Sequence, residues 1–187
     1  MTDVFAVLRA WLPDNADPIR PPMTLATLDA DGYPDARTVL LSALDDHGVQ
    51  FHTDARSRKA AELAAAPRAC VVIPIGERDR QITLVGDVEP LGPDALREAY
   101  RRRTRYLQVL AWVNSDELAA RPAGQRHQAW QAFEDTNPGP LEPPATWTGF
   151  RLRPHRVTFW TADELGPSTR LEYRRSGDGW TTHALAG

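Results

Sequence analysis

The chain has 187 residues, a formal net charge of −3 and an apolar fraction of 42%, with a sequence pI of about 5.9. This length suits one domain, or one domain with a small appendix, that buries a sizeable core. An acidic chain has no global positive field, so a nucleic-acid partner is not expected. No apolar run reaches the roughly 18 residues of a membrane span, and no signal peptide is visible. We expect a cytoplasmic protein without a membrane partner.

Strand-forming segments separated by tight turns dominate the first half of the chain. In chain order, the pattern predicts a helix over 3–12, strands over 23–28, 35–43 and 49–53, a helix over 56–66, and strands over 68–75 and 80–89. Cys70 is the only cysteine, which excludes an internal disulfide. Its apolar neighbours predict a buried core position.

The second half begins with helices and ends with strands. Helices are expected over 94–107 and 115–134, the second of which Pro122 can break. The proline-rich residues 136–146 form a loop, and strands follow over 147–153, 155–161, 170–175 and 179–185. About 40 residues are few for an independent core, so these strands should join the main sheet. The prediction is one domain over 1–187, mainly β with peripheral helices (α+β), in which a largely antiparallel barrel carries helices outside.

One cluster of polar residues points to a phosphate ester. Arg37 opens an apolar strand, Thr53 ends the next one, and Ser57, Arg58 and Lys59 stand where a helix should begin. Fixed cations, hydroxyls and free backbone N–H groups suit a phosphate. The plainer interpretation is a solvated helix start with Ser57 as its cap. A basic pair in the first helical turn opposes the helix dipole, which favours a ligand role.

Three residues of later strands are candidates for contact with a flat ring. Gln81 could offer a donor and an acceptor to a heterocycle, although a strand glutamine is often merely exposed. Trp160 ends one strand and Arg170 opens the next, and an aromatic and arginine pair can flank a ring. Core or interface packing is the plainer role for the tryptophan.

The remaining polar groups carry weaker signals. The helix over 94–107 holds Arg97, Arg101, Arg102, Arg103 and Arg105, which are best explained as a solvated face, with an anionic substrate or a partner subunit as alternatives. The five histidines show no H-x-x-x-H or H-E-x-x-H spacing and no CxxC exists, so no metal site is indicated.

Eight segments in the same order resemble the pyridoxamine 5′-phosphate oxidase family, whose fold is the FMN-binding split barrel. The likeness runs from about Pro22 to the C-terminus. The matching segments begin at Met23, Arg37, Phe51, Ser57, Arg80, Ala111, Trp147 and Phe159. The resemblance implies a homodimer with FMN at the subunit interface, residues 147–187 as C-terminal dimerisation strands, and hydride transfer from substrate to FMN with reoxidation by O₂.

The resemblance also implies roles for individual residues. Arg37, Thr53, Arg58 and Lys59 would hold the FMN phosphate, the segment 37–41 would offer backbone groups, Gln81 would contact the ring, and Trp160 and Arg170 would come from the partner chain. The full set implied for the cofactor is Arg37, Thr38, Val39, Leu40, Leu41, His52, Thr53, Ser57, Arg58, Lys59, Gln81, Trp160 and Arg170.

The positions implied for substrate depart from the family pattern. Where the family has a lysine, a tyrosine, an arginine and a serine around the substrate phosphate, this chain has Ser42, Ala99, Arg103 and Leu107. The late Arg-x-His-x-Arg signature reads Gly166 to Arg170, which puts Ser168 at the histidine position. Asp116 and Glu117 replace a Gln-Ser pair that touches FMN.

Three lost charged contacts, at roughly 1.5–3 kcal/mol each, would weaken the binding of a phosphorylated pyridoxine by several orders of magnitude. The leading hypothesis is therefore an FMN-dependent oxidase acting on a different small, ring-containing and non-phosphorylated substrate, bound near Ser42, Arg103, Leu107 and Ser168. One alternative is a genuine pyridoxine/pyridoxamine 5′-phosphate oxidase that makes pyridoxal 5′-phosphate. Another is a non-catalytic protein that binds a flavin or another cofactor. No catalytic acid or base stands out.

Overall fold

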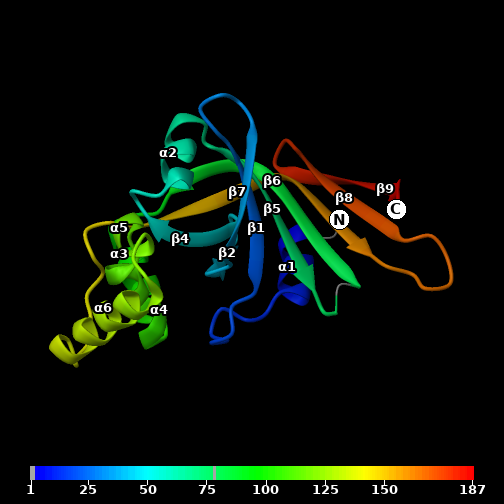
Figure 1. Cartoon of the computed structure of the whole chain (residues 1–187). Coiled ribbons are helices and arrows are strands. Elements are labelled where there is room, and N and C mark those ends of the chain that lie inside the picture. Colours follow the sequence, from blue (N-terminus) through cyan, green and yellow to red (C-terminus); the bar gives the residue numbers. More distant parts are fainter. Residues whose placement is uncertain (1–2, 78) are drawn as a thin grey trace.

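The computed structural model describes residues 3–77 and 79–187 and consists mainly of strands (Figure 1). All strand pairs are antiparallel. The strands are β1 (Pro22–Leu28), β2 (Pro34–Leu40), β3 (Ala43–Leu44), β4 (Val49–Asp54), β5 (Arg68–Ile75), β6 (Arg80–Pro90), β7 (Trp147–Thr161), β8 (Thr169–Ser176) and β9 (Gly179–Ala186).

Six helices accompany the sheet in the described residues. They are α1 (Val4–Trp11), α2 (Arg58–Ala65), α3 (Pro93–Arg101), α4 (Arg105–Val113), α5 (Asp116–Ala119) and α6 (Ala123–Thr136). Helices α3 to α6 form one group at the end of the sheet opposite the β8–β9 hairpin (Figure 1). This mainly β architecture with peripheral helices confirms the predicted fold class. No helix in the described ranges is both long enough and apolar enough to cross a membrane.

The sheet is organised around β7, a strand of 15 residues. The order along the sheet is β2-β1-β5-β6-β7-β4-β3, and β8 also pairs with β7 and then with β9. One edge of β7 pairs with β6 from Phe150 to Thr161, while the other edge pairs with β4 up to Leu152 and with β8 from Arg156. A single strand therefore joins the barrel to the C-terminal hairpin.

Continuity of β7 corrects the expectation of separate strands over 147–153 and 155–161. Pro154 has no N–H to donate, but it lies in the gap between β4 and β8, where neither strand pairs with β7. The pairing with β6 shifts its register between Val85 and Gly86 at the same level, a bulge that leaves His155 without a partner in the β6 register.

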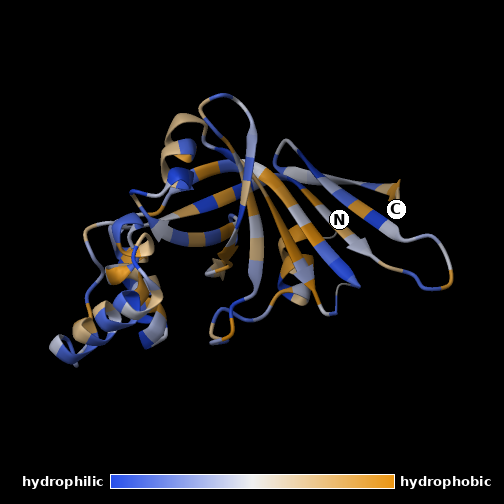
Figure 2. Cartoon of the chain, in the orientation of Figure 1, coloured by the Kyte–Doolittle hydropathy of each residue, from blue (hydrophilic) through white to orange (hydrophobic). Residues whose placement is uncertain are grey.

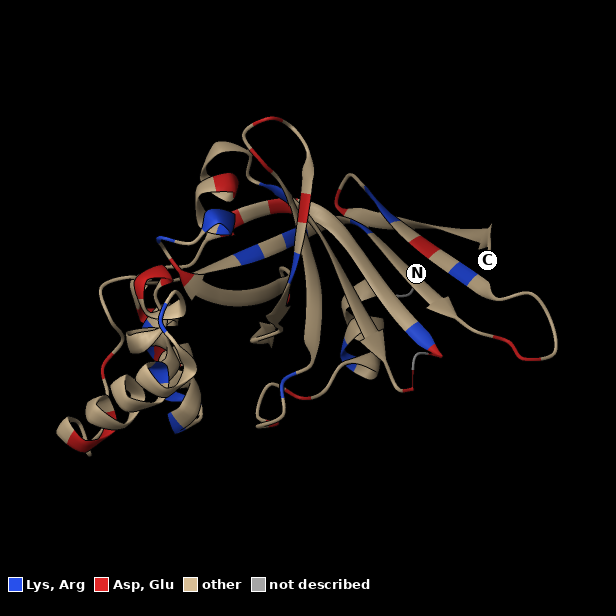
Figure 3. Ribbon diagram, in the orientation of Figure 1, with Lys and Arg blue, Asp and Glu red and all other residues tan. Residues whose placement is uncertain are grey.

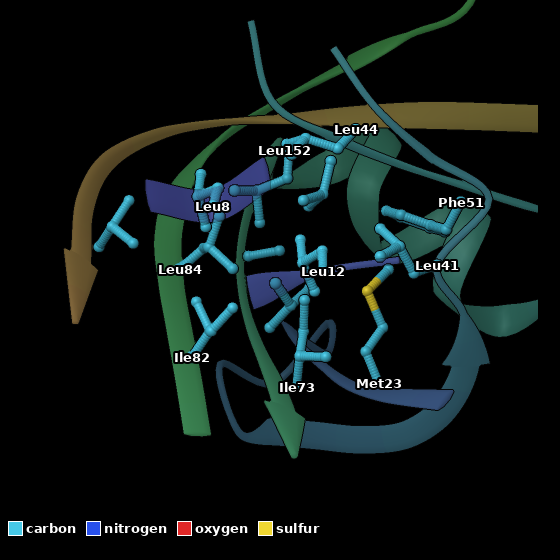
Figure 4. Close-up of a cluster of buried hydrophobic side chains, with 14 of the residues drawn as sticks. Leu8, Leu12, Met23, Leu41, Leu44, Phe51, Ile73, Ile82, Leu84 and Leu152 are labelled. Atoms are coloured by element: carbon cyan, nitrogen blue, oxygen red, sulfur yellow. The ribbon is translucent and has the colours of Figure 1, made fainter. Parts of the chain in front are cut away.

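Alternating strand residues build the core. Figure 2 shows the resulting bands of apolar and polar residues along the strands. Inward-facing side chains include Met23, Ile73, Ile82 and Leu84, which are fully buried, and α1 adds Leu8 (Figure 4). Helix α1 therefore contributes to the core rather than lying outside it, because its apolar face fills one side of the curled sheet.

Two further expectations are wrong in detail. The helix expected over 94–107 is broken, because the hydroxyl of Thr104 accepts a bond from the N–H of Leu107 and starts a new helix, α4. Cys70 is half-buried instead of being a core residue, because the alternation of β5 turns Ala69 and Val71 inward and Cys70 outward. The loop after α6 and the break near Pro122 agree with expectation.

The bulge predicts a strong requirement for glycine at position 86. A Cβ there would lie 2.0 Å from the carbonyl oxygen of Arg153 and 2.7 Å from the Cα of Pro154, both of which are backbone atoms. We expect Gly86→Ala to lower the free energy of unfolding by about 2 kcal/mol, measured by urea denaturation. Gly124→Ala on α6, where a Cβ meets nothing within 4 Å, is the matched control and should be neutral or stabilising. Equal stability of both variants would contradict this account of the bulge.

Candidate functional site

Two adjoining cavities lie between the barrel and the helical group. The first, called the lysine cavity, has a volume of about 470 Å³ and is lined by residues of β2, β4, α2 and α4, with Lys59 at one end. The second, called the serine cavity, has a volume of about 820 Å³ and is lined by residues 14–18, the segment after β2, and α3, with Ser42 in its wall. Four residues line both cavities: Leu40, His52, Arg103 and Leu107. The two spaces therefore meet.

Donors suited to a phosphate gather at the start of α2. Lys59, the only lysine of the chain, donates to the hydroxyl of Thr53 at 3.3 Å. It has no carboxylate within 4 Å among the residues that the structure describes. Burial lowers the pKa of Lys59, and the nearby charge of Arg37 lowers it further. The charges of Glu62 and Asp54 act in the opposite direction without contacting Lys59, and an anion placed here would give it a direct partner.

Ser57 leaves the first turn of α2 open to a ligand. Its side chain makes no capping bond, although it occupies the N-cap position. Its hydroxyl lies 3.2 Å from that of Thr53 instead. The N–H groups at the start of the helix thus keep their capacity to bind an anion, and two hydroxyls stand beside them.

Arg37 and Arg58 have carboxylate partners in this structure. The guanidinium of Arg37 donates to the carboxylate of Glu62 at 2.8 Å and to the hydroxyl of Thr27, and it pairs with Asp35 at 2.8 Å. Arg58 has an exposed side chain that pairs with Asp35 at 3.1 Å and does not line the lysine cavity. Arg37 does line that cavity, but its charge is shared with buried Glu62.

The segment expected to offer backbone groups follows β2. This strand stands at the end of the sheet, so part of its backbone lacks a strand partner. Thr38, Val39 and Leu40 line the lysine cavity. Leu41 does not: its side chain is fully buried in the core, its N–H donates to the carbonyl of Pro21, and its carbonyl accepts from Arg20.

The serine cavity collects most of the substrate candidates. Ser42, Arg103 and Leu107 all line it, as does Ala99. Ser168 lies in none of the cavities described here and belongs to the segment before β8. Asp116 and Glu117 are exposed in the first turn of α5 and are absent from the lining of the lysine cavity. Their charges therefore do not face Lys59 within it.

Arg103 differs from the other arginines of its segment. Arg97, Arg101 and Arg102 pair with carboxylates at the surface, and Arg105 donates to backbone carbonyls, as expected of a solvated face (Figure 3). The guanidinium of Arg103 instead lies 4.3 Å from the centre of the Trp147 ring, with no carboxylate within 4 Å in the described ranges. Burial lowers the pKa of Arg103 to about 10. It remains a cation that faces both cavities.

His52 occupies the wall between the two cavities. Its ring stacks on Trp147 with centroids 5.1 Å apart and planes 4° apart, and only 7% of the residue is exposed. Nδ1 lies 2.8 Å from the hydroxyl oxygen of Ser42, whereas Nε2 is buried with no hydrogen-bond partner in the described structure. Burial, aided by the charge of Arg103, lowers the pKa of His52 to about 3. The ring is therefore neutral at physiological pH.

A third cavity, on another face of the sheet, contains the remaining candidates. Gln81 on β6 pairs in register with Trp160 on β7, which pairs with Arg170 on β8, so the three lie in one row across three strands. They line a cavity of about 360 Å³ that shares no residue with the lysine cavity. Within one chain, this row does not join the cluster around Lys59.

Sequence reasoning missed two residues of the site. Trp147 was noted only as part of a matching segment, yet its ring contacts His52 and Arg103, and its Nε1 donates to the carbonyl of Leu96 at 3.0 Å. Arg20 lines the serine cavity and its Nε donates to the carbonyl of Leu41, one residue before Ser42. The proline-rich segment around Arg20 gave no signal that it returns to this cavity.

Neutral His52 predicts a specific dependence of stability on pH. Its pKa falls from 6.5 when unfolded to about 3 when folded, so the unfolded chain binds the extra proton between these values. The contribution of neutral His52 to the free energy of unfolding is complete above pH 6.5 and is lost as the pH falls towards 3. Relative to His52→Asn, the wild type should lose about 2 kcal/mol more on going from about pH 7.5 to about pH 5 in urea denaturation. Exposed His127→Asn should match the wild type, and an equal loss in both variants would contradict a neutral buried ring.

Two family models match most of the chain. Residues 17–138 match the family model described as pyridoxamine 5′-phosphate oxidase, and residues 147–187 match the pyridoxine 5′-phosphate oxidase C-terminal dimerisation region. A pyridoxine/pyridoxamine 5′-phosphate oxidase of Caulobacter vibrioides is 34% identical over 188 residues, which cover 98% of this chain and 84% of the relative. One of Pseudomonas syringae is 35% identical over 191 residues, covering 97% and 87%.

Solved structures share the fold. PhzG from Burkholderia lata 383, in complex with tetrahydrophenazine-1-carboxylic acid, superposes with a TM-score of 0.85 at 25% identity and covers 100% of this chain and 94% of its own. A pyridoxamine 5′-phosphate oxidase-related, FMN-binding protein from Nostoc punctiforme gives a TM-score of 0.62 at 23% identity, covering 88% and 87%. The expected split barrel is confirmed. Since family models match most of the chain and relatives align over nearly all of it, the chain belongs to the pyridoxamine 5′-phosphate oxidase family.

Proposed function

We propose that this protein is an FMN-dependent oxidoreductase that takes a hydride from a small, ring-containing, non-phosphorylated substrate and uses O₂ as the electron acceptor. The observation that carries the proposal is the junction of the two cavities at Leu40, His52, Arg103 and Leu107. One cavity has donors for a phosphate and the other has room for a second ring. A cofactor in the lysine cavity and a substrate in the serine cavity would therefore be neighbours.

The donor set of the lysine cavity fits FMN. Lys59 has no ion pair among the described side chains, and Ser57 leaves the start of α2 uncapped, so a phosphate would supply the missing partner. Thr53 adds a hydroxyl, and the edge strand β2 adds backbone groups from Thr38 to Leu40. Arg37 and Arg58 would contribute charge in addition to their existing ion pairs.

We further propose a homodimer in which the row of Gln81, Trp160 and Arg170 completes the flavin site of the other chain. The match of residues 147–187 to a dimerisation region supports an interface at β7, β8 and β9. The row and the lysine cavity share no residue, so in this proposal the row reaches the cofactor from the partner chain. In this dimer Gln81, like Trp160 and Arg170, would reach the cofactor of the partner chain. The proposal treats residues 1–187 as a single domain.

FMN supplies the two-electron redox chemistry when it is bound. The chain's own groups bind and orient the cofactor and the substrate. Lys59, Thr53 and Ser57 would hold the phosphate end of the cofactor. Arg103 and the stacked rings of His52 and Trp147 would form the wall between cofactor and substrate. His52 stays neutral and buried, so it does not serve as a proton acceptor near neutral pH.

The serine cavity supports a substrate without a phosphate ester. Ser42, Ala99 and Leu107 carry no charge, which leaves Arg103 as the surviving cation of the family's phosphate site. The alternative is a genuine pyridoxine/pyridoxamine 5′-phosphate oxidase. Arg20 favours it, because this cation lines the same cavity as Ser42 and its Nε donates to the carbonyl of Leu41, the residue before Ser42.

An anaerobic titration distinguishes the two substrate classes. We expect pyridoxine 5′-phosphate to leave the flavin absorbance of the FMN-loaded protein unbleached, because Ser42, Ala99 and Leu107 stand where the family has three of its four phosphate-binding side chains. Ser42→Lys should increase affinity for this compound about tenfold or more by restoring one charge-assisted contact. Rapid bleaching of the wild-type flavin would establish the alternative and exclude the proposed substrate class.

The role of Lys59 is tested by comparing two ligands. Lys59→Met should raise the Kd for FMN about tenfold to a hundredfold, since a contact to a charged group is worth roughly 1.5–3 kcal/mol. The Kd for riboflavin, which has no phosphate, should be unchanged in fluorescence titrations. Arg58→Met, which removes an exposed and already paired cation, should have a smaller effect on FMN. An equal loss for both ligands would mean that Lys59 does not bind the phosphate.

A further inference from the structure

The contact between Ser42 and His52 has a direction that decides what the serine cavity can bind. Nδ1 of His52 lies 2.8 Å from the hydroxyl oxygen of Ser42. A hydroxyl can donate or accept, so two arrangements satisfy this distance. In one, Ser42 donates to the ring and presents a lone pair to the cavity. In the other, the ring donates to Ser42, and the hydroxyl hydrogen is free to bond a ligand.

The surroundings of Nε2 favour the second arrangement. A neutral imidazole carries a proton on only one of its two nitrogens. If Nδ1 accepts from Ser42, Nε2 carries the proton; if Nδ1 donates to Ser42, Nε2 is bare. Nε2 is buried without a partner, and orphaned buried N–H groups are rarer than under-used acceptors. Gly149 lies against this edge of the ring: a Cβ added to Gly149 would lie 2.9 Å from Nε2 and 2.5 Å from Cδ2 of His52. A glycine hydrogen there fits a bare nitrogen better than an N–H.

The charged group beside His52 keeps the ring neutral. Arg103, in the turn between α3 and α4, is the charge that lowers the pKa of His52 in addition to burial. Trp147 from β7 covers one ring face, and Leu96 from α3 lies near the Gly149 side of the ring. The proton on Nδ1 therefore has one partner, the oxygen of Ser42.

We propose that His52 is a positioning residue that fixes the Ser42 hydroxyl as a hydrogen-bond donor into the serine cavity, so that this cavity selects a ring compound carrying an anionic oxygen acceptor. Arg103 supplies the matching charge in the same cavity. A hydroxyl donor beside Arg103, in a cavity that Arg20 also lines, suits the oxygens of an acidic group on the ring. This inference rests on the proposed function and names the group by which the substrate is recognised.

The tautomer is tested on the ligand-free protein by long-range proton–nitrogen NMR of ¹⁵N-histidine-labelled samples. His52→Asn identifies the signals of His52 by their disappearance. We expect Nδ1 to show the shift of a protonated nitrogen and Nε2 that of an unprotonated one at neutral pH. A proton on Nε2, or a doubly protonated ring, would overturn the proposal whatever the protein's activity.

The selection of an acidic group is tested by calorimetric titration of the FMN-loaded protein with quinoline-2-carboxylate, quinoline and pyridoxine 5′-phosphate. Ser42→Ala and His52→Phe, which keeps the aromatic stack, should each weaken binding of the carboxylate about fivefold to tenfold. The double variant should be no weaker than either single variant, because His52 acts through Ser42. His52→Asn, whose amide can donate in place of Nδ1, should restore most of the affinity, and quinoline should be insensitive throughout.

The outcomes separate the inference from the proposed function. If the variants lose affinity for pyridoxine 5′-phosphate and not for the carboxylate, Ser42 still donates to an anionic oxygen. The proposal of a non-phosphorylated substrate would then be wrong. Additive losses in the double variant, or equal losses for quinoline, would overturn the role of His52. If the wild type binds none of the three probes, the claim of an acidic ring ligand is rejected, and the NMR result alone decides the tautomer.

Discussion

The ring of Trp147 fixes the geometry on which both cavities depend. It is nine-tenths buried at the first position of β7, and its Nε1 donates to the carbonyl of Leu96, which ties α3 to the sheet. One contact stacks His52, another edge contact holds Tyr100, and the guanidinium of Arg103 lies over the same ring. A single aromatic side chain thus sets the positions of groups contributed by a strand and by the start of the helical group. Buried aromatic rings can do this because their contacts are large and directional.

Most cations in the described part of the chain are paired with carboxylates. Most ion pairs join surface arginines to nearby carboxylates, and such exposed pairs add little to stability. Arg37 is an exception, because it offsets the charge of buried Glu62, whose removal from water would otherwise be costly. Lys59 and Arg103 have no carboxylate partner among the described residues. Both line the lysine cavity, so two of the unpaired charges lie where an anionic ligand would reside.

The long strand β7 explains why the two groups of candidate residues lie apart within one chain. Its first half pairs with β4 beside the lysine and serine cavities, and its second half pairs with β8 in the row that contains Trp160 and Arg170. Pro154 and the bulge at Gly86 mark the change of partner. Because a strand is rigid along its length, the two halves stay apart within one chain. A second copy of the chain is the simplest way to bring such a row against the first face.

The sequence by itself determined the fold class, most of the elements and the local cluster of polar residues at the start of α2. Apolar alternation and turn residues depend on neighbours only a few positions away, and the phosphate cluster of Thr53, Ser57 and Lys59 is local as well. Tertiary structure decided the rest. It placed α1 in the core, turned Cys70 outward, joined two expected strands across Pro154, and brought Arg20 to the cavity of Ser42. It also placed Arg103, and not its neighbouring arginines, over the ring of Trp147. These outcomes depend on contacts between residues far apart in the chain, and a local pattern carries no information about which of several equal side chains will meet a distant ring.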